Sequence, residues 1–125
     1  MTDDPTFDIP ARPERRFSRT TVRYDGDVEF RLTPAEGDTN EIEGLVSDVL
    51  DTGPYRYGDW FDLPMTLFLV HDDATHDTFR VSVRDGRITL HVLPETGSAG
   101  LRALYDRLVA ESDCSWSVDR RVEMV

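Results

Sequence analysis

Lysine is absent from this chain of 125 residues, and all 14 of its basic residues are arginine. They stand against 25 aspartates and glutamates, which gives a formal net charge of −11. This combination is typical of haloarchaeal proteins, in which a carboxylate surface faces molar salt that screens charges within about 3 Å. We therefore predict a halophilic protein, whose net charge by itself reveals little about its partners.

Cysteine is almost absent as well, since Cys114 stands alone and cannot form a disulfide within the chain. It lies in an alternating apolar run where a small buried side chain fits, so we interpret it as a core residue. Long apolar runs are also missing. Residues 1–16 contain no signal-peptide core, and no stretch approaches the roughly 20 residues of a membrane span. We expect a cytoplasmic protein with no membrane partner.

The length predicts one domain, because a chain of this size buries about two thirds of its unfolded surface. Three prolines interrupt residues 1–16, so we expect a flexible tail there and a single α+β domain over 17–125. Arginines are concentrated between residues 12 and 23, which suggests an arm for nucleic acid or a segment that pairs with the chain's own carboxylates. Since the rest of the chain would repel phosphate, we do not expect nucleic acid as the partner.

The clearest local pattern is a β-hairpin between residues 79 and 93. Asp85-Gly86 is a preferred dipeptide of the two-residue type I′ turn, and alternating apolar residues flank it on both sides. This turn would pair Val83 with Ile88, and the same register places all apolar residues of the hairpin on one face. The other face then carries Arg80, Ser82, Arg84, Arg87, Thr89 and His91.

A second Asp-Gly dipeptide, at residues 25–26, predicts another hairpin over 19–33 with a three-residue loop, or else one long bent strand. Asp38 followed by Glu41 has the form of a helix cap, and the apolar stripe after it predicts a helix to about residue 51. A similar stripe predicts a helix over 98–111. The apolar run 66–70 is typical of a central strand covered on both faces, and alternation over 114–122 predicts a last strand.

These elements predict an α+β fold in the order ββαβββαβ, with two helices on one face of a mainly antiparallel sheet of about five to six strands. The two Asp-Gly turns also superimpose at an offset of 60 residues, each followed by an alternating strand, a proline and a helix. We therefore consider an internal duplication of a ββαβ unit. The alternative is that two similar strand-to-helix connections arose independently.

Candidate contact residues lie in two groups. Arg80, Arg84, Arg87 and His91 share a hairpin face that contains no acid, although an ordinary solvent face in so acidic a chain should carry carboxylates. We interpret this face as covered by a protein partner, a second copy or an anionic ligand, or as paired with the chain's own acids. The second group is aromatic and has the composition of an interface; it consists of Tyr55, Tyr57, Trp60 and Phe61.

A metal site is a further hypothesis, because the turn 71–77 concentrates potential ligands for a divalent ion, namely His71, Asp73, His76 and Asp77. Their spacing matches no metalloenzyme motif, and the chain has no nucleophile elbow or phosphate-binding glycine loop. We therefore predict a non-enzymatic protein, without a cofactor, that acts through protein association as a homodimer, regulator or adaptor. The alternative is an anion- or metal-binding domain, or an enzyme, that uses Arg80, His91 and the turn.

Overall fold

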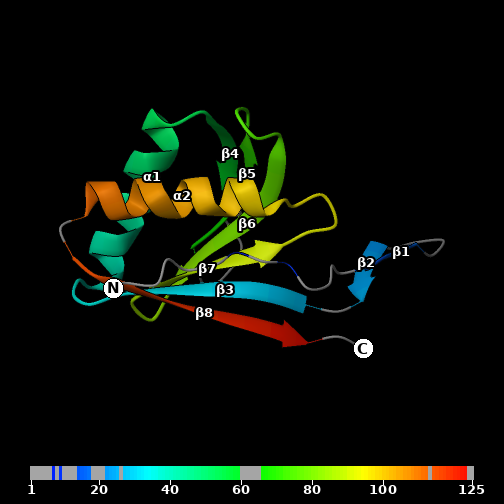
Figure 1. Cartoon of the computed structure of the whole chain (residues 1–125), viewed down its shortest axis with the longest axis horizontal. Helices are drawn as coiled ribbons and strands as arrows, with labels where there is room; N and C mark the ends of the chain where they lie inside the picture. The colour runs from blue at the N-terminus through cyan, green and yellow to red at the C-terminus, as the bar shows by residue number, and fades with distance from the viewer. Residues whose placement is uncertain are drawn as a thin grey trace.

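The computed structural model describes residues 7, 9, 14–17, 22–25, 27–59, 66–112 and 114–123, and two helices cover one face of its main sheet (Figure 1). The sheet has six antiparallel strands in the order β4-β5-β6-β7-β3-β8. This arrangement confirms the predicted α+β class and the mainly antiparallel sheet. The elements are β1 (Glu14–Phe17), β2 (Val22–Asp25), β3 (Asp27–Pro34), α1 (Thr39–Thr52), β4 (Tyr55–Asp59), β5 (Thr66–Asp72), β6 (Asp77–Arg84), β7 (Arg87–Val92), α2 (Ser98–Glu111) and β8 (Trp116–Glu123).

The hairpin of β6 and β7 has the register that the sequence predicted. Val83 pairs with Ile88, and Arg84 pairs with Arg87 beside the turn. Asp85 and Gly86 both have positive φ, at 54° and 74°, as a type I′ turn requires. The turn is therefore the local signal that fixes which side chains of both strands face the helices.

The predicted second hairpin is wrong. β2 pairs with β1 in a separate two-stranded sheet, whereas β3 lies between β7 and β8. Val28, Phe30 and Leu32 of β3 are completely buried, and the interior position of this strand lets all three side chains pack into the core. Tertiary packing therefore decided the place of β3, and the Asp-Gly dipeptide did not.

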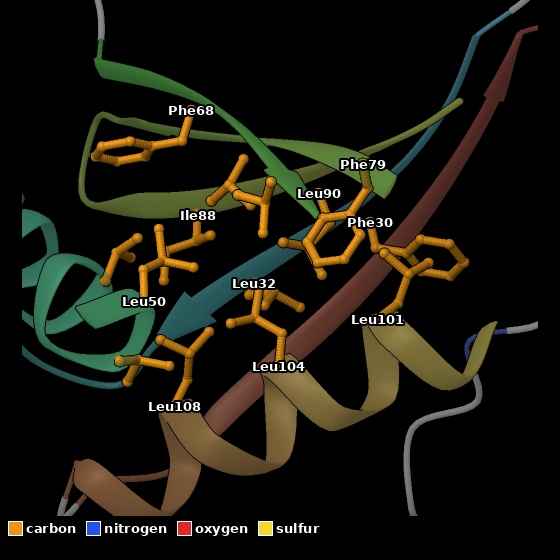
Figure 2. Close-up of a cluster of buried hydrophobic side chains, with 14 of the residues drawn as sticks. Phe30, Leu32, Leu50, Phe68, Phe79, Ile88, Leu90, Leu101, Leu104 and Leu108 are labelled. Carbon is orange, nitrogen blue, oxygen red and sulfur yellow. The ribbon is translucent and has the colours of Figure 1, made fainter. Parts of the chain in front are cut away.

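Both helices follow their predicted bounds closely. Asp38 accepts a hydrogen bond from the Glu41 amide at 2.8 Å, which confirms the N-terminal cap of α1. The core lies between the helices and the sheet, and Figure 2 shows Leu101, Leu104 and Leu108 of α2 directed toward the strands. Each such leucine contributes about 1.5–3 kcal/mol when fully buried.

Two further expectations about the sheet need correction. β5 is the second strand from an edge, and Leu69 is 37% exposed, so this strand is not covered on both faces. β4 is a full strand that pairs with β5, and together with β1 it makes two strands more than the predicted order. The duplication also gains no support, because the equivalent strands β3 and β7 have different neighbours.

Phe7 anchors part of the N-terminal segment in the core. Its side chain is 4% exposed, and its ring lies 5.2 Å from that of Phe30 and 5.5 Å from that of Tyr105. An aromatic residue with these neighbours contributes to the core, although it precedes the predicted start of the domain at residue 17.

Candidate functional site

The candidate site is the side of the six-stranded sheet that faces away from both described helices, which we call the open face (Figure 1). Side chains alternate along each strand, so the residues between the buried ones project from this side. In sheet order from β4 to β8, the open face carries Arg56, Leu67, Leu69, His71, Thr78, Arg80, Ser82, Arg84, Arg87, Thr89, His91, Asp27, Glu29, Arg31, Asp119, Arg121 and Glu123.

Charge is distributed unequally over the molecule. The open face bears the arginines Arg31, Arg56, Arg80, Arg84, Arg87 and Arg121, and the register places four acids there, namely Asp27, Glu29, Asp119 and Glu123. The helices bear most of their exposed charge as carboxylates; these are Glu41, Asp48, Asp51, Asp106 and Glu111. A chain with a net charge of −11 therefore has one basic side. The predicted basic hairpin face is the centre of that side.

Several of these arginines pair with nearby acids of the same chain, as one of the sequence interpretations proposed. Arg31 lies 2.7 Å from Glu29, and Arg56 lies 2.8 Å from Asp73. The Arg56 side chain is 74% exposed, and exposed pairs of this kind contribute only about 0–1 kcal/mol. The Arg56 guanidinium can therefore exchange Asp73 for a carboxylate on another molecule, whereas the Arg31–Glu29 pair is more buried, at 26% and 13% exposed.

Ser82, His91 and Glu29 form a row across β6, β7 and β3. Ser82 Oγ lies 3.0 Å from His91 Nε2, and His91 Nδ1 lies 3.6 Å from Glu29 Oε2. A hydroxyl, an imidazole and a carboxylate in this order are the components of a hydrolytic relay. Ser82, however, is only 5% exposed, and Arg31 also holds Glu29, so a substrate could not reach the hydroxyl oxygen in this arrangement. The row ties three neighbouring strands together.

Of the potential metal ligands of the turn, the structure brings His71 and Asp73 near each other, with His71 Nε2 3.7 Å from Asp73 Oδ1, but it does not gather the set. His71 Nδ1 lies 2.9 Å from Thr78 Oγ1, Asp73 pairs with Arg56, and Asp77 accepts a hydrogen bond from the Gly100 amide. His76 has a positive φ of 63° within the turn. Among the described residues, which include the whole turn, no three acidic, histidine or cysteine side chains are placed to hold one metal ion.

The aromatic group is divided as well. Tyr55 is 9% exposed and belongs to the core, where its hydroxyl accepts a hydrogen bond from Arg107 at 3.0 Å. Burial raises the pKa of Tyr55 above 10, and the Arg107 charge opposes this shift. Tyr57 is half exposed on β4, packs edge-on against Phe68, and donates a hydrogen bond to Asp51. Tyr55 is therefore unavailable to a partner. Trp60 and Phe61 lie outside the described residues.

A buried carboxylate pair, which the sequence pattern did not predict, lies at the ends of β5 and β6. Asp72 and Asp77 are directly opposite in the register and are 0% and 9% exposed. Asp72 accepts hydrogen bonds from the amides of Ala74 and Thr75, so it shapes the turn. The signal that could have revealed Asp77 is the Gly97 and Gly100 spacing at the start of α2, which leaves space for its side chain.

Cys114 is half-buried, more open than the predicted core position. It lines a cavity of about 190 Å³ together with Ile42, Leu45 and Trp116. The Trp116 indole donates a hydrogen bond to Ser112 Oγ at 2.7 Å, which fixes one wall.

None of the described helices is long and apolar enough to cross a membrane. Comparison of the chain with known protein families, with curated proteins and with solved structures finds no match, so its function has to be argued from its own residues.

Proposed function

We propose that the protein acts by association, and that the open face binds an acidic surface of a partner protein. The observation that carries this proposal is the concentration of arginines on one side of a chain whose net charge is −11. Guanidinium groups form charge-assisted, two-pronged hydrogen bonds with carboxylates. A partner that presents aspartates and glutamates would therefore be complementary to this side.

Chemistry at the open face has less support than association. The hypothesis of an anion or metal site requires the histidines to converge, but His71 and His91 lie on β5 and β7 with β6 between them. Each of the two is within 3.0 Å of a hydroxyl of its neighbouring strand. Their contacts favour a role in strand pairing.

The arginines also argue against contact between the open faces of two copies. A twofold symmetric interface brings the same patch of both subunits together, so arginine would lie against arginine. Like charges in contact across an interface oppose association, even though salt at 1 M shortens the range of the repulsion to about 3 Å. An acidic face of another protein avoids this cost.

The experiment compares Arg87→Glu, on the open face, with Arg102→Glu, on the helical side, because both substitutions change the net charge equally. The probe is a fluorescent glutamate-rich peptide in molar KCl, and the measurement is its anisotropy. Loss of one guanidinium–carboxylate contact should weaken binding by about tenfold for Arg87→Glu. Arg102→Glu should leave binding almost unchanged.

Equal effects of the two substitutions would contradict the proposal, because binding would then follow net charge and not the face. A single-stranded oligonucleotide serves as a second polyanion. If it bound more tightly than the peptide and depended on Arg87, the partner would be a nucleic acid, and the proposal of an acidic protein would be wrong.

A further inference from the structure

The edge strand β8 is a second surface on which the chain can associate. β8 has eight residues and pairs with β3 along its whole length, but no described strand lies on its other side. Its sequence contains neither proline nor glycine, two of the means by which proteins protect an edge. The backbone groups of this edge that face away from β3 are therefore a template for another strand.

The pattern of backbone hydrogen bonds tells which groups of β8 face outward. The Ala35 amide donates to the Ser115 carbonyl at 2.8 Å, so Ser115 directs its backbone groups toward β3. In an antiparallel pair these groups alternate from residue to residue. Val118, Arg120 and Val122 consequently direct their amides and carbonyls toward the open edge, and these residues must face each other in any added strand.

This constraint leaves a small set of registers for two antiparallel copies of β8. When Arg120 lies on the twofold axis, Asp119 is opposite Arg121 of the second copy, and the pair occurs twice. When the twofold axis lies at Asp119, Asp119 is opposite Asp119 of the second copy. When the axis lies at Arg121, Asp119 is opposite Glu123 of the second copy and Arg121 is opposite Arg121. Of these three registers, one is complementary in charge, and both of its neighbours are repulsive.

The same register also matches apolar side chains. Val118 is opposite Val122 of the second copy, again twice, on the side of the sheet that carries the helices. Val122 is 41% exposed, which makes it one of the large apolar residues that the fold leaves most open to solvent. Pairing would cover it. The cost of the register is the approach of the two Arg120 side chains at the axis, which molar salt reduces.

We propose that two copies of the chain associate through β8 in this register, which joins their sheets into one. The Asp119 and Arg121 side chains are 66% and 56% exposed and lie 3.3 Å apart, so they are free to form a four-charge cluster with the second copy. Because the twofold axis is perpendicular to the sheet, both open faces lie on the same side of the dimer. The basic surface is thereby doubled. This proposal concerns the edge and stands independently of what the open face binds.

The test is a charge exchange measured as molar mass by light scattering in molar KCl. The wild type should be a dimer. Asp119→Arg and Arg121→Asp should each raise the dissociation constant of the dimer by about tenfold or more, since each places like charges opposite one another twice. The double variant Asp119→Arg/Arg121→Asp restores opposite charges and should restore the dimer. Circular dichroism identifies any variant that fails to fold.

A monomeric wild type would overturn the proposal, as would a dimer that neither single substitution weakens. Failure of the double variant to recover the dimer, while folded, would also overturn it. The open-face variant Arg84→Glu/Arg87→Glu provides the control and should stay dimeric. If that variant became monomeric and the β8 variants stayed dimeric, the copies would associate through the open face and not through β8. The binding of the glutamate-rich peptide tests the acidic partner separately.

Discussion

Asp77 Oδ2 accepts a hydrogen bond of 2.7 Å from the backbone amide of Gly100, across 23 positions of the sequence. This bond joins the start of β6 to the first turn of α2, where Gly97 at the N-cap has no side chain with which to accept it. A carboxylate near the N-terminus of a helix is also favoured by the helix dipole. Asp77 thus caps α2 from another part of the fold.

Replacement of this cap should destabilise the protein. Asp77→Ala leaves the buried Gly100 amide without its acceptor, and we expect a loss of about 1–3 kcal/mol in the free energy of unfolding. Asp38→Ala removes the local cap of α1 at an exposed position and should cost about 1 kcal/mol. Urea unfolding at fixed KCl concentration measures both. A smaller loss for Asp77→Ala than for Asp38→Ala would contradict the role of Asp77.

The two glycines at the start of α2 should tolerate no side chain. A Cβ at Gly100 would lie 2.6 Å from Asp77 Cβ, and one at Gly97 would lie 2.5 Å from Asp77 Oδ1. Gly100→Ala should therefore destabilise the protein by about 1–3 kcal/mol, as overpacking does. Gly44→Ala is the matched control, since a Cβ there meets nothing within 4 Å in the exposed middle of α1. It should stabilise the protein by about 0.5–1 kcal/mol.

Gly100 and Asp77 together offer a test of this mechanism. If Gly100→Ala acts through the clash with Asp77, its cost should shrink in an Asp77→Gly background, because glycine removes both the Cβ and the carboxylate that oppose the added Cβ. Thermal unfolding of the two single variants and the double variant gives the coupling between them. Strict additivity of the two losses would show that the clash is not the cause.

Tyr55 should ionise at a higher pH than an ordinary tyrosine. Burial raises its pKa above 10, so the folded state binds the proton more tightly than the unfolded chain. The resulting stabilisation is complete below pH 10 and is lost as the pH rises through the folded pKa. The difference between the tyrosinate absorbance titrations of wild type and Tyr55→Phe isolates this group among the four tyrosines.

Arg107 gives this titration an internal control. Its guanidinium lies 5.4 Å from the centre of the Tyr55 ring, and its charge and hydrogen bond both lower the pKa of Tyr55. Arg107→Ala should therefore move the ionisation of Tyr55 to still higher pH. A shift toward lower pH would mean that Arg107 does not lower the pKa of Tyr55.

Local chemistry predicted most of the fold, and long-range packing explains what it missed. Asp85-Gly86 fixed the β6–β7 register because both residues determine the turn by themselves. The same dipeptide at residue 25 gave a wrong hairpin, since the burial of Phe30 and its neighbours placed β3 between β7 and β8.

At the candidate site too, local patterns predicted some placements and long-range packing decided the others. Alternation along the hairpin placed Arg80, Arg84, Arg87 and His91 on one face, and the structure confirms this arrangement. Sequence could not reveal that Tyr55 is buried, because an edge strand with alternating aromatics is compatible with either orientation. The Asp77–Gly100 bond was not predicted either, because it connects the start of β6 to a helix that begins 21 positions later, and only the spacing of Gly97 and Gly100 points to it.

The turn that organises the hairpin should be sensitive to the loss of its glycine. Gly86 has a φ of 74°, a conformation that costs a residue with a Cβ about 1–2 kcal/mol, and its amide donates to Thr39 Oγ1 at 2.9 Å. Gly86→Ala should therefore lower the free energy of unfolding by about 1–2 kcal/mol. Gly58→Ala is the control, because Gly58 lies in the edge strand β4 without a positive φ and a Cβ there meets nothing within 4 Å. It should be neutral or slightly stabilising in the same urea titration. Equal effects at the two positions would mean that backbone conformation does not hold this hairpin in register, and the apolar pairs Val83–Ile88 and Val81–Leu90 would then be sufficient.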